Sequence, residues 1–377
     1  MSEKKRKYGL DLLRIVSMMM ILILHLLGKG GVLNDTKLFS FNNNLAWILE
    51  NLCIVAVNCY ILISGYFSVT SKKFNIKRII NIWGKVIFYS VTIGVTLMII
   101  GWADKNIINM LNTFFPIITK SYWFISVYIV LSVLSPFLNL MIQRLTKEQY
   151  RKLIVVMMVV FSIIPSFVPS EFMIDITGGL GICWFITLYL VAGYIRLHIP
   201  EEKIFKKTFL KYLVFSMILF AFRSVLALVL ERLNMDINHS QKWLSYNTII
   251  LFLSSLYLFL YFKQMDIKNN KIISFIEKIT PYILSVYIIH EQPLLRKILY
   301  TDILDIGAFL NKWYLIFIVF SYAVIIFIIC IFIDYIRHYV CERIARTKIG
   351  TRAEEFLNKT TAAIKKIASN MFDKCEN

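Results

Sequence analysis

Long apolar runs separated by short polar loops dominate the chain. About 20 mostly apolar residues carry a helix across a hydrocarbon core of roughly 30 Å. The runs are continuous and do not alternate between polar and apolar positions, so they favour helices over the strands of a membrane barrel. The pattern predicts an all-α integral membrane protein, a polytopic bundle of about ten transmembrane helices at residues 8–27, 46–67, 79–101, 122–142, 153–168, 178–197, 209–230, 244–262, 279–295 and 313–335.

The basic residues in the loops predict how this bundle is oriented. Of the 42 Lys and Arg, 30 fall on the side of the N-terminus, nine fall on the other side and three fall within spans. Cytoplasmic loops are enriched in Lys and Arg, so we expect both termini in the cytoplasm. The net charge of +19 is then mainly a topology signal whose partners are anionic lipid headgroups, and we expect no nucleic-acid partner.

Composition excludes several other classes of protein. The chain is 58% hydrophobic and only 17% charged, with a mean hydropathy of +0.67, which does not fit a soluble, disordered or fibrous protein. The six cysteines include no CxxC pair, so we expect neither zinc nor disulfides. The loops are too short for a soluble catalytic domain. We therefore divide the chain into a membrane domain, 1–338, and a basic cytoplasmic tail, 339–377.

Two ionisable residues in the first span are candidates for chemistry. Arg14 and His25 are 11 residues apart, about 16 Å along a helix and within about 20° of the same face. Arg binds phosphate through a permanently charged fork, whereas neutral His is a base near physiological pH. The spacing alone leaves open that Arg14 pairs with Asp11 or snorkels to the headgroups, and that His25 bonds a backbone carbonyl.

Further polar and aromatic residues in the spans are candidates for the same site or for contacts between helices. His290 has Tyr287 one turn earlier and Glu291 beside it, at a depth within reach of His25. A charged side chain within a span costs free energy of insertion, so its presence indicates a function or a polar partner. The remaining candidates, which we assign to cofactor or substrate binding, are Lys85, Glu50, Arg223, Trp123 and Trp184.

Five stretches in order resemble one known family over residues 8–338. The first is GLDLLRIVSMMMILILH, with Arg and His separated by ten residues. The others are VNCYILISGYF followed by the basic KKFNIKR, YWFISVYIVLSVLSPFLN, ICWFITLYLVAGYIRLH and SVYIIH. Together they resemble the membrane acyltransferase-3 family, and within it the bacterial polysaccharide O-acetyltransferase type. One departure is Asn58 and Cys59, which stand where many members carry apolar or aromatic residues.

The resemblance implies an activity and roles for particular residues. It implies that acetyl-CoA or another acyl-CoA is the donor on the cytoplasmic side of a bacterial plasma membrane. It also implies that a hydroxyl of a surface or lipid-linked glycan is the acceptor. Arg14 and His25 are then the functional pair, and Arg78 is the basic residue that follows the Ser-Gly motif. We expect the CoA phosphates at Arg14, Arg78 and Lys85.

On this interpretation His25 has one of two roles that the sequence does not separate. It is either the general base on the sugar hydroxyl or a nucleophile that briefly carries the acyl group. His290 and Tyr287 then orient His25 or bind the acceptor.

Two activities of other classes fit the same hydropathy pattern. Ten spans with intramembrane Arg and His are equally expected of a polysaccharide exporter, a flippase or another secondary transporter, although no internal repeat is evident. A polysaccharide polymerase fits less well because the longest outer loop, 102–121, is short.

Overall fold

The computed structural model describes residues 6–71, 76–168 and 178–347 and several positions between 351 and 362, and these residues form helices and no strands. Within this part of the chain, eight helical segments are long and apolar enough to span a membrane. They are Tyr8–Lys29 (α1), Phe41–Ser68 (α3 and α4), Ile76–Ile99 (α5), Trp123–Arg144 (α7), Lys147–Phe167 (α8 to α9), Thr208–Arg232 (α11), Asn270–His290 (α13 and α14) and Leu315–Ala345 (α16).

Three further helices complete the match with the ten predicted spans. The helix Ile237–Leu244 meets Ile249–Gln264 (α12) at 44°, and this pair counts as a ninth span if it is taken as one. Ile182–His198 (α10) is apolar but has only 17 residues. All ten predicted runs thus lie on helices, and the prediction of an all-α polytopic membrane protein is confirmed.

Several element boundaries differ from the prediction. The segment predicted to begin at 153 begins at Lys147, because Thr146 and Gln149 form a reciprocal capping box. Pro293 cannot donate an intrahelical hydrogen bond and restricts the residue before it, and the ninth segment ends at His290 instead of 295. The helix α16 continues to Ala345, past the predicted domain boundary at 338. Most of the predicted tail lies outside the described residues.

Several short helices either connect the spans or form parts of them. Val32–Asp35 (α2) follows α1, and Phe41–Cys53 (α3) continues after a break into Ala56–Ser68 (α4). Ile107–Phe114 (α6) lies between α5 and α7. The remaining short helices are Lys147–Met158 (α8), Ile164–Phe167 (α9), Asn270–Ile279 (α13), Ile283–His290 (α14) and Leu295–Ile298 (α15).

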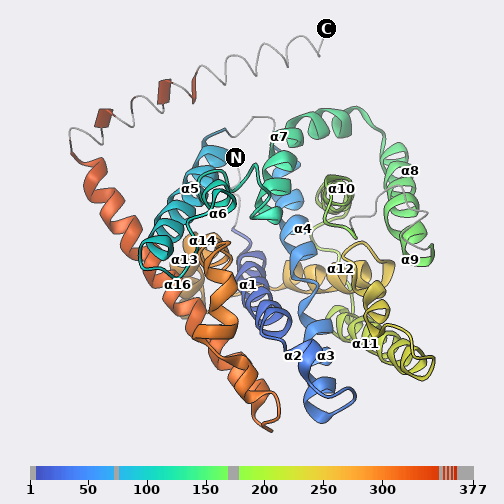
Figure 1. Ribbon diagram of the computed structural model, residues 1–377. Coiled ribbons are helices and arrows are strands. Elements are labelled where there is room, and N and C mark those ends of the chain that lie inside the picture. The colour runs from blue at the N-terminus through green and yellow to red at the C-terminus, as the bar shows by residue number, and fades with distance from the viewer. Residues whose placement is uncertain are drawn as a thin grey trace.

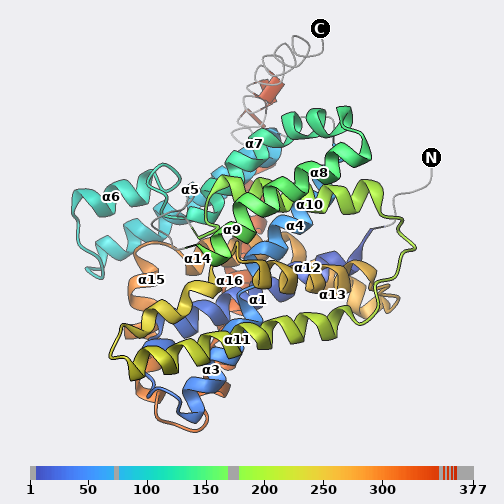
Figure 2. The same cartoon turned by 90° about the vertical axis from the view of Figure 1, so that its right-hand side faces the viewer.

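The helix α1 lies at the centre of the bundle (Figure 1), with α16 and α14 on one side and α4 and α12 on the other. Its residues belong to two hydrophobic clusters. Met18 and Leu22 pack with α14 and α16, whereas Leu10 and Leu13 pack with α4, α10 and α12. The view in Figure 2 shows α6 projecting from the bundle, with α11 and α3 at the opposite edge from α7 and α8. A change in α1 therefore acts on both halves of the core.

The Ser-Gly motif has a packing role. A Cβ at Gly65 would lie 2.9 Å from the backbone of Tyr189, so only glycine lets α4 approach α10 this closely. Asn58, one of the departures from the family pattern, accepts a hydrogen bond from Nε1 of Trp184 at 3.1 Å and donates to the carbonyl of Tyr246 at 2.9 Å. Its polar side chain thus cross-links three segments of the core.

A buried carboxylate joins α5, α14 and α16. Asp334 is fully buried and accepts hydrogen bonds from the hydroxyls of Tyr89 at 2.7 Å and Ser285 at 2.6 Å. It also pairs with Nζ of Lys85 at 3.2 Å and with Nε of Arg337 at 2.5 Å. Removing one member of such a cluster leaves buried charge without compensation.

We therefore expect Asp334→Asn to destabilise the protein by about 3–5 kcal/mol, because Lys85 and Arg337 would lose their shared anion. The measurement is thermal unfolding of the purified full chain in detergent. Asp302→Asn, at an exposed position, is the control. Equal melting temperatures for the two variants would contradict a stabilising role of this cluster.

Candidate functional site

A cavity of about 650 Å³ lies between α1, α4, α5, α7 and α14. Arg14, Met18 and Ile21 form its wall on α1, at spacings that place them on one helical face. The next position on this face is His25. The predicted groove from Arg14 toward His25 thus coincides, over its first two turns, with the wall of a real cavity.

Among the described residues, four cationic side chains line this cavity: Arg14, Lys77, Arg78 and Lys85. Arg14 also pairs with Asp11, so the intrahelical pair left open by the sequence is present together with the exposure to the cavity. The concentration of positive charge makes this part of the cavity suited to a polyanion.

Two of these cations are held by neighbouring helices. Arg78 donates to the hydroxyl of Tyr128 on α7, and its guanidinium lies 5.7 Å from the centre of the Tyr128 ring. Lys85 pairs with Asp334 and donates to Oγ of Ser285 at 3.2 Å. Both side chains are therefore fixed before any ligand binds.

The two predicted histidines meet directly, although they are 265 positions apart in the chain. Nδ1 of His25 lies 3.0 Å from Nε2 of His290, and Nδ1 of His290 lies 2.6 Å from the carbonyl oxygen of Val286. A carbonyl only accepts, so His290 carries its proton on Nδ1 and offers Nε2 as an acceptor. His25 then donates from Nδ1, which leaves its Nε2 unprotonated and able to act as a base.

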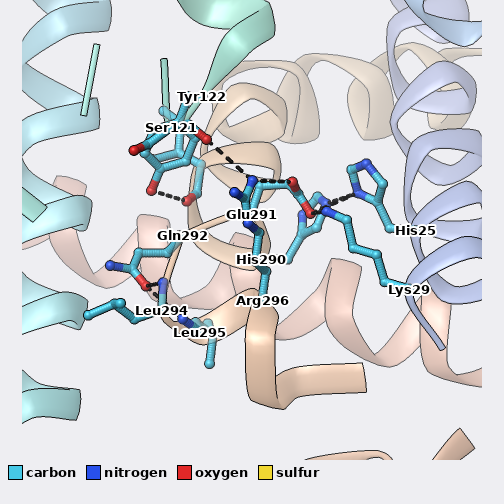
Figure 3. Close-up of polar contacts among 11 residues, drawn as sticks. His25, Lys29, Ser121, Tyr122, His290, Glu291, Gln292, Leu294, Leu295 and Arg296 are labelled. Carbon is cyan, nitrogen blue, oxygen red and sulfur yellow. Dashed lines mark hydrogen bonds and ion pairs between the residues drawn. The ribbon is translucent and has the colours of Figure 1, made fainter. Parts of the chain in front are cut away.

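Glu291 completes this cluster (Figure 3). Its Oε1 lies 3.2 Å from Nδ1 of His25 and accepts a hydrogen bond from Lys29, while its Oε2 lies 3.4 Å from Nη1 of Arg296. Arg296 also donates to the carbonyl of Ser121 at 3.3 Å. The carboxylate, only 5% exposed, is thus held by two cations and directed at His25.

The donor set of His25, His290 and Glu291 is also one that metals use, and one ligand atom from each lies within 4.8 Å of the others. Lys29 and Arg296 already neutralise Glu291, however, so a divalent cation would meet two positive charges. The spacing of 3.0 Å between the ring nitrogens fits a hydrogen bond. The geometry and charge of this cluster therefore suit a hydrogen-bonded histidine pair better than a metal site.

Tyr287 connects the cavity to the histidine pair. It lines the cavity, and its ring lies 6.0 Å from that of His290 in an edge-to-face arrangement. The rings of His290 and His25 are 5.2 Å apart. The side chains of Tyr287, His290 and His25 thus run in sequence from the cavity to the end of α1.

The residues predicted to bind substrate lie away from this cavity wall. Glu50 and Arg223 line two smaller cavities near Trp47, on the side of the bundle where α1 ends. Trp123 packs against Phe185 with ring centres 6.3 Å apart, and Trp184 is fully buried with its Nε1 bonded to Asn58. In this structure both tryptophans make core contacts.

Four residues of the site had no predicted role: Glu291, Lys29, Arg296 and Lys77. A signal exists for Lys29, which lies four residues after His25 and so on the same face. The position of Glu291 beside His290 was a signal toward His25, but no sequence signal joins Glu291 to Lys29, because the two helices that carry them are far apart in the chain.

Comparison with known proteins gave one finding. A family model described as an acyltransferase domain matches residues 7–335. Neither the search of curated proteins nor the search of solved structures found a match. The match includes the whole bundle up to α16, with the basic cavity and the histidine pair, and the chain belongs to the membrane acyltransferase-3 family.

Proposed function

We propose that the protein moves an acetyl or other short acyl group from cytoplasmic acyl-CoA to a hydroxyl of a surface or lipid-linked carbohydrate. It would do so in a bacterial plasma membrane, with both termini in the cytoplasm. The observation that carries the proposal is the continuous path from a basic cavity, past Tyr287, to a paired and carboxylate-supported histidine.

The cavity supports acyl-CoA as the donor. CoA carries several phosphate charges on one end of an extended, flexible arm, and four cations line the cavity. Arg14 is eleven positions before His25, about 16 Å along α1, so the cations and the base are separated as the head and the thioester of such a donor would be. Arg14, Arg78 and Lys85 are the phosphate contacts we propose, and we add Lys77 because it lines the same cavity.

The histidine cluster supports general-base chemistry. Nε2 of His25 takes the proton of the sugar hydroxyl while that oxygen attacks the thioester carbonyl. The carbon–sulfur bond then breaks, and the proton passes from His25 to the departing CoA thiolate. Glu291 favours this route, because its negative charge stabilises the imidazolium that His25 becomes. The same lone pair would serve in the acyl-imidazole alternative.

The main test compares surface polysaccharide from cells with native protein, with His25→Ala at matched expression and with no protein. Ester-linked acyl groups are measured by mass before and after mild alkali. We expect an alkali-labile increment in cells with the native protein and none in the other two samples, because the His25→Ala variant lacks the base. His239→Ala, at an exposed histidine, should retain the increment.

Equal acylation in all samples, with altered export or length of the polymer, would contradict the transferase and favour the transporter or polymerase alternatives.

The contact between Glu291 and His25 predicts that Glu291→Gln lowers kcat for acyl transfer by about 100-fold, with little change in KM for acetyl-CoA. The amide lacks the charge that stabilises the protonated His25. Steady-state kinetics of the purified full chain measures both constants, and Glu291→Asp should recover part of the rate. Glu231→Gln, at an exposed position, is the control and should keep the native kcat. If Glu291→Gln also keeps the native kcat, the carboxylate does not assist His25.

The basic cavity predicts that Arg78→Gln raises KM for acetyl-CoA by about 10- to 100-fold, since a charge-assisted hydrogen bond contributes about 1.5–3 kcal/mol. KM for the glycan should stay the same. Lys152→Gln removes an exposed cation and is the control. If both variants change KM equally, the effect is one of general surface charge and the cavity is not the donor site.

A further inference from the structure

A second pocket lies near Trp47 on α3, on the side of the bundle where α1 ends. It consists of two adjoining cavities of about 390 and 300 Å³ that share Leu33, Trp47 and Gln241 as walls. We call it the Trp47 pocket. The larger cavity also contains Arg223 and the smaller one Glu50. In the described part of the chain, neither cavity shares a lining residue with the basic cavity described above.

Arg223 is an unusual residue in this pocket. It is 2% exposed, and the centre of its guanidinium lies 3.8 Å from the centre of the Trp47 ring. Its Nε and Nη1 have no hydrogen-bond partner among the described residues, and no described carboxylate lies within ion-pair distance of it. Arg223 thus holds a charge and at least two donors that this part of the chain does not satisfy.

Other groups near Arg223 are also unsatisfied. Nε1 of Trp47 and Oε2 of Glu50 are buried and have no partner in the described part of the chain. Asp334 shows how the same bundle treats a buried charge that serves structure, since every oxygen of that carboxylate has a partner. A buried arginine with open donors instead indicates a site that a ligand completes.

The walls indicate the chemistry of that ligand. Amide and hydroxyl side chains from three segments line the larger cavity: Asn34, Thr36, Asn43, Asn238 and Gln241. Such groups bind sugar hydroxyls, and a guanidinium binds a carboxylate or a phosphate through its fork. An acidic carbohydrate carries both kinds of group. Asn43 donates to Thr36 and Gln241 donates to Asn238, so these groups are held along the wall. A lipid headgroup would use the guanidinium but would not need a wall of amides.

The position of the pocket connects it with the reaction. Leu33 lies on α2, directly after α1, and it packs with Leu24 against the cluster of Trp47. Leu24 precedes His25. An acceptor held in the Trp47 pocket therefore lies beside the end of α1 that carries the proposed base, on the side opposite to the donor cations.

We propose that the Trp47 pocket binds a carboxylate or phosphate group of an acidic carbohydrate acceptor, with Arg223 as the residue that recognises the anion. This inference rests on the proposed function for the identity of the ligand as acceptor. Arg223 is then a binding residue that decides which glycans are acylated and takes no part in proton transfer.

The test measures binding without transfer, on the purified full chain in detergent. The probes are a fluorescent uronate-containing tetrasaccharide, its carboxyl-reduced neutral form and a glycerol-phosphate tetramer, measured by fluorescence anisotropy. We expect the native protein to bind the uronate or the phosphate probe at least tenfold more tightly than the neutral one. Arg223→Gln should abolish this preference, whereas Arg232→Gln, at an exposed arginine of the same helix, should retain it.

Three results would overturn the proposal. One is equal affinity of the native protein for acidic and neutral probes. Another is loss of the preference when the protein is moved from phosphatidylcholine to phosphatidylglycerol nanodiscs, which would assign the pocket to a lipid headgroup. The third is tighter binding of the acidic probe after Glu171 and Asp175, which lie outside the described residues, are both changed to amides. That result would show that Arg223 has a partner within the chain.

Folding and catalysis are separated from binding by two controls. If Arg223→Gln aggregates on size exclusion, competition on the native protein decides the matter, because glucuronate or inorganic phosphate should displace the probe and glucose should not. His25→Ala should bind the acidic probe normally. Selective binding without any acyl transfer would contradict the proposed function alone, whereas acyl transfer without selective binding would contradict this inference alone.

Discussion

The cost of burying charge in an apolar bundle is the constraint on which the rest of this structure depends. An ionised side chain away from water must have a partner of opposite sign, a set of hydrogen bonds, or a ligand. Asp334 meets this condition through two cations and two hydroxyls, and Glu291 meets it through Lys29 and Arg296. These clusters fix the helices that carry them.

The central helix α1 is held so that it presents two ionisable side chains, Arg14 and His25, in fixed positions. Its apolar faces pack into two separate hydrophobic clusters, so its rotation about its own axis is fixed from both sides. The remaining face presents Arg14 to the basic cavity and His25 to His290. A helix held in this way keeps Arg14 and His25 at a constant separation, and such positioning is a large part of what the proposed acyl transfer needs.

The cavity and the Trp47 pocket use buried cations in contrasting ways. In the cavity, Lys85 and Arg78 are held by Asp334 and Tyr128 while still facing open space, so both cations are already held by partners within the protein. In the Trp47 pocket, Arg223 has the face of an indole ring and two open donors. A preorganised cluster suits a donor shared by many enzymes, whereas an incompletely satisfied arginine suits a ligand that must be selected.

From the sequence alone, the all-helical class and the approximate positions of the apolar helices could be predicted, because a continuous apolar run of sufficient length has no other stable form in a membrane. The sequence also placed Arg14 and His25 on one face, since helical spacing is a local property. Hydropathy alone does not predict the boundaries at Lys147 and His290, because a capping box sets the first and a proline sets the second.

The contacts between groups distant in the chain are known from the fold alone. The contact of His25 with His290 and Glu291 joins positions more than 260 residues apart, and the pairing of Lys85 with Asp334 joins α5 to α16. The fold also decided that Trp184 packs in the core against Asn58 while Arg223 faces a pocket, although both are large side chains in apolar spans. Hydropathy records how much of a helix is apolar, but not the neighbour that each face receives, and the chemistry of this protein depends on those neighbours.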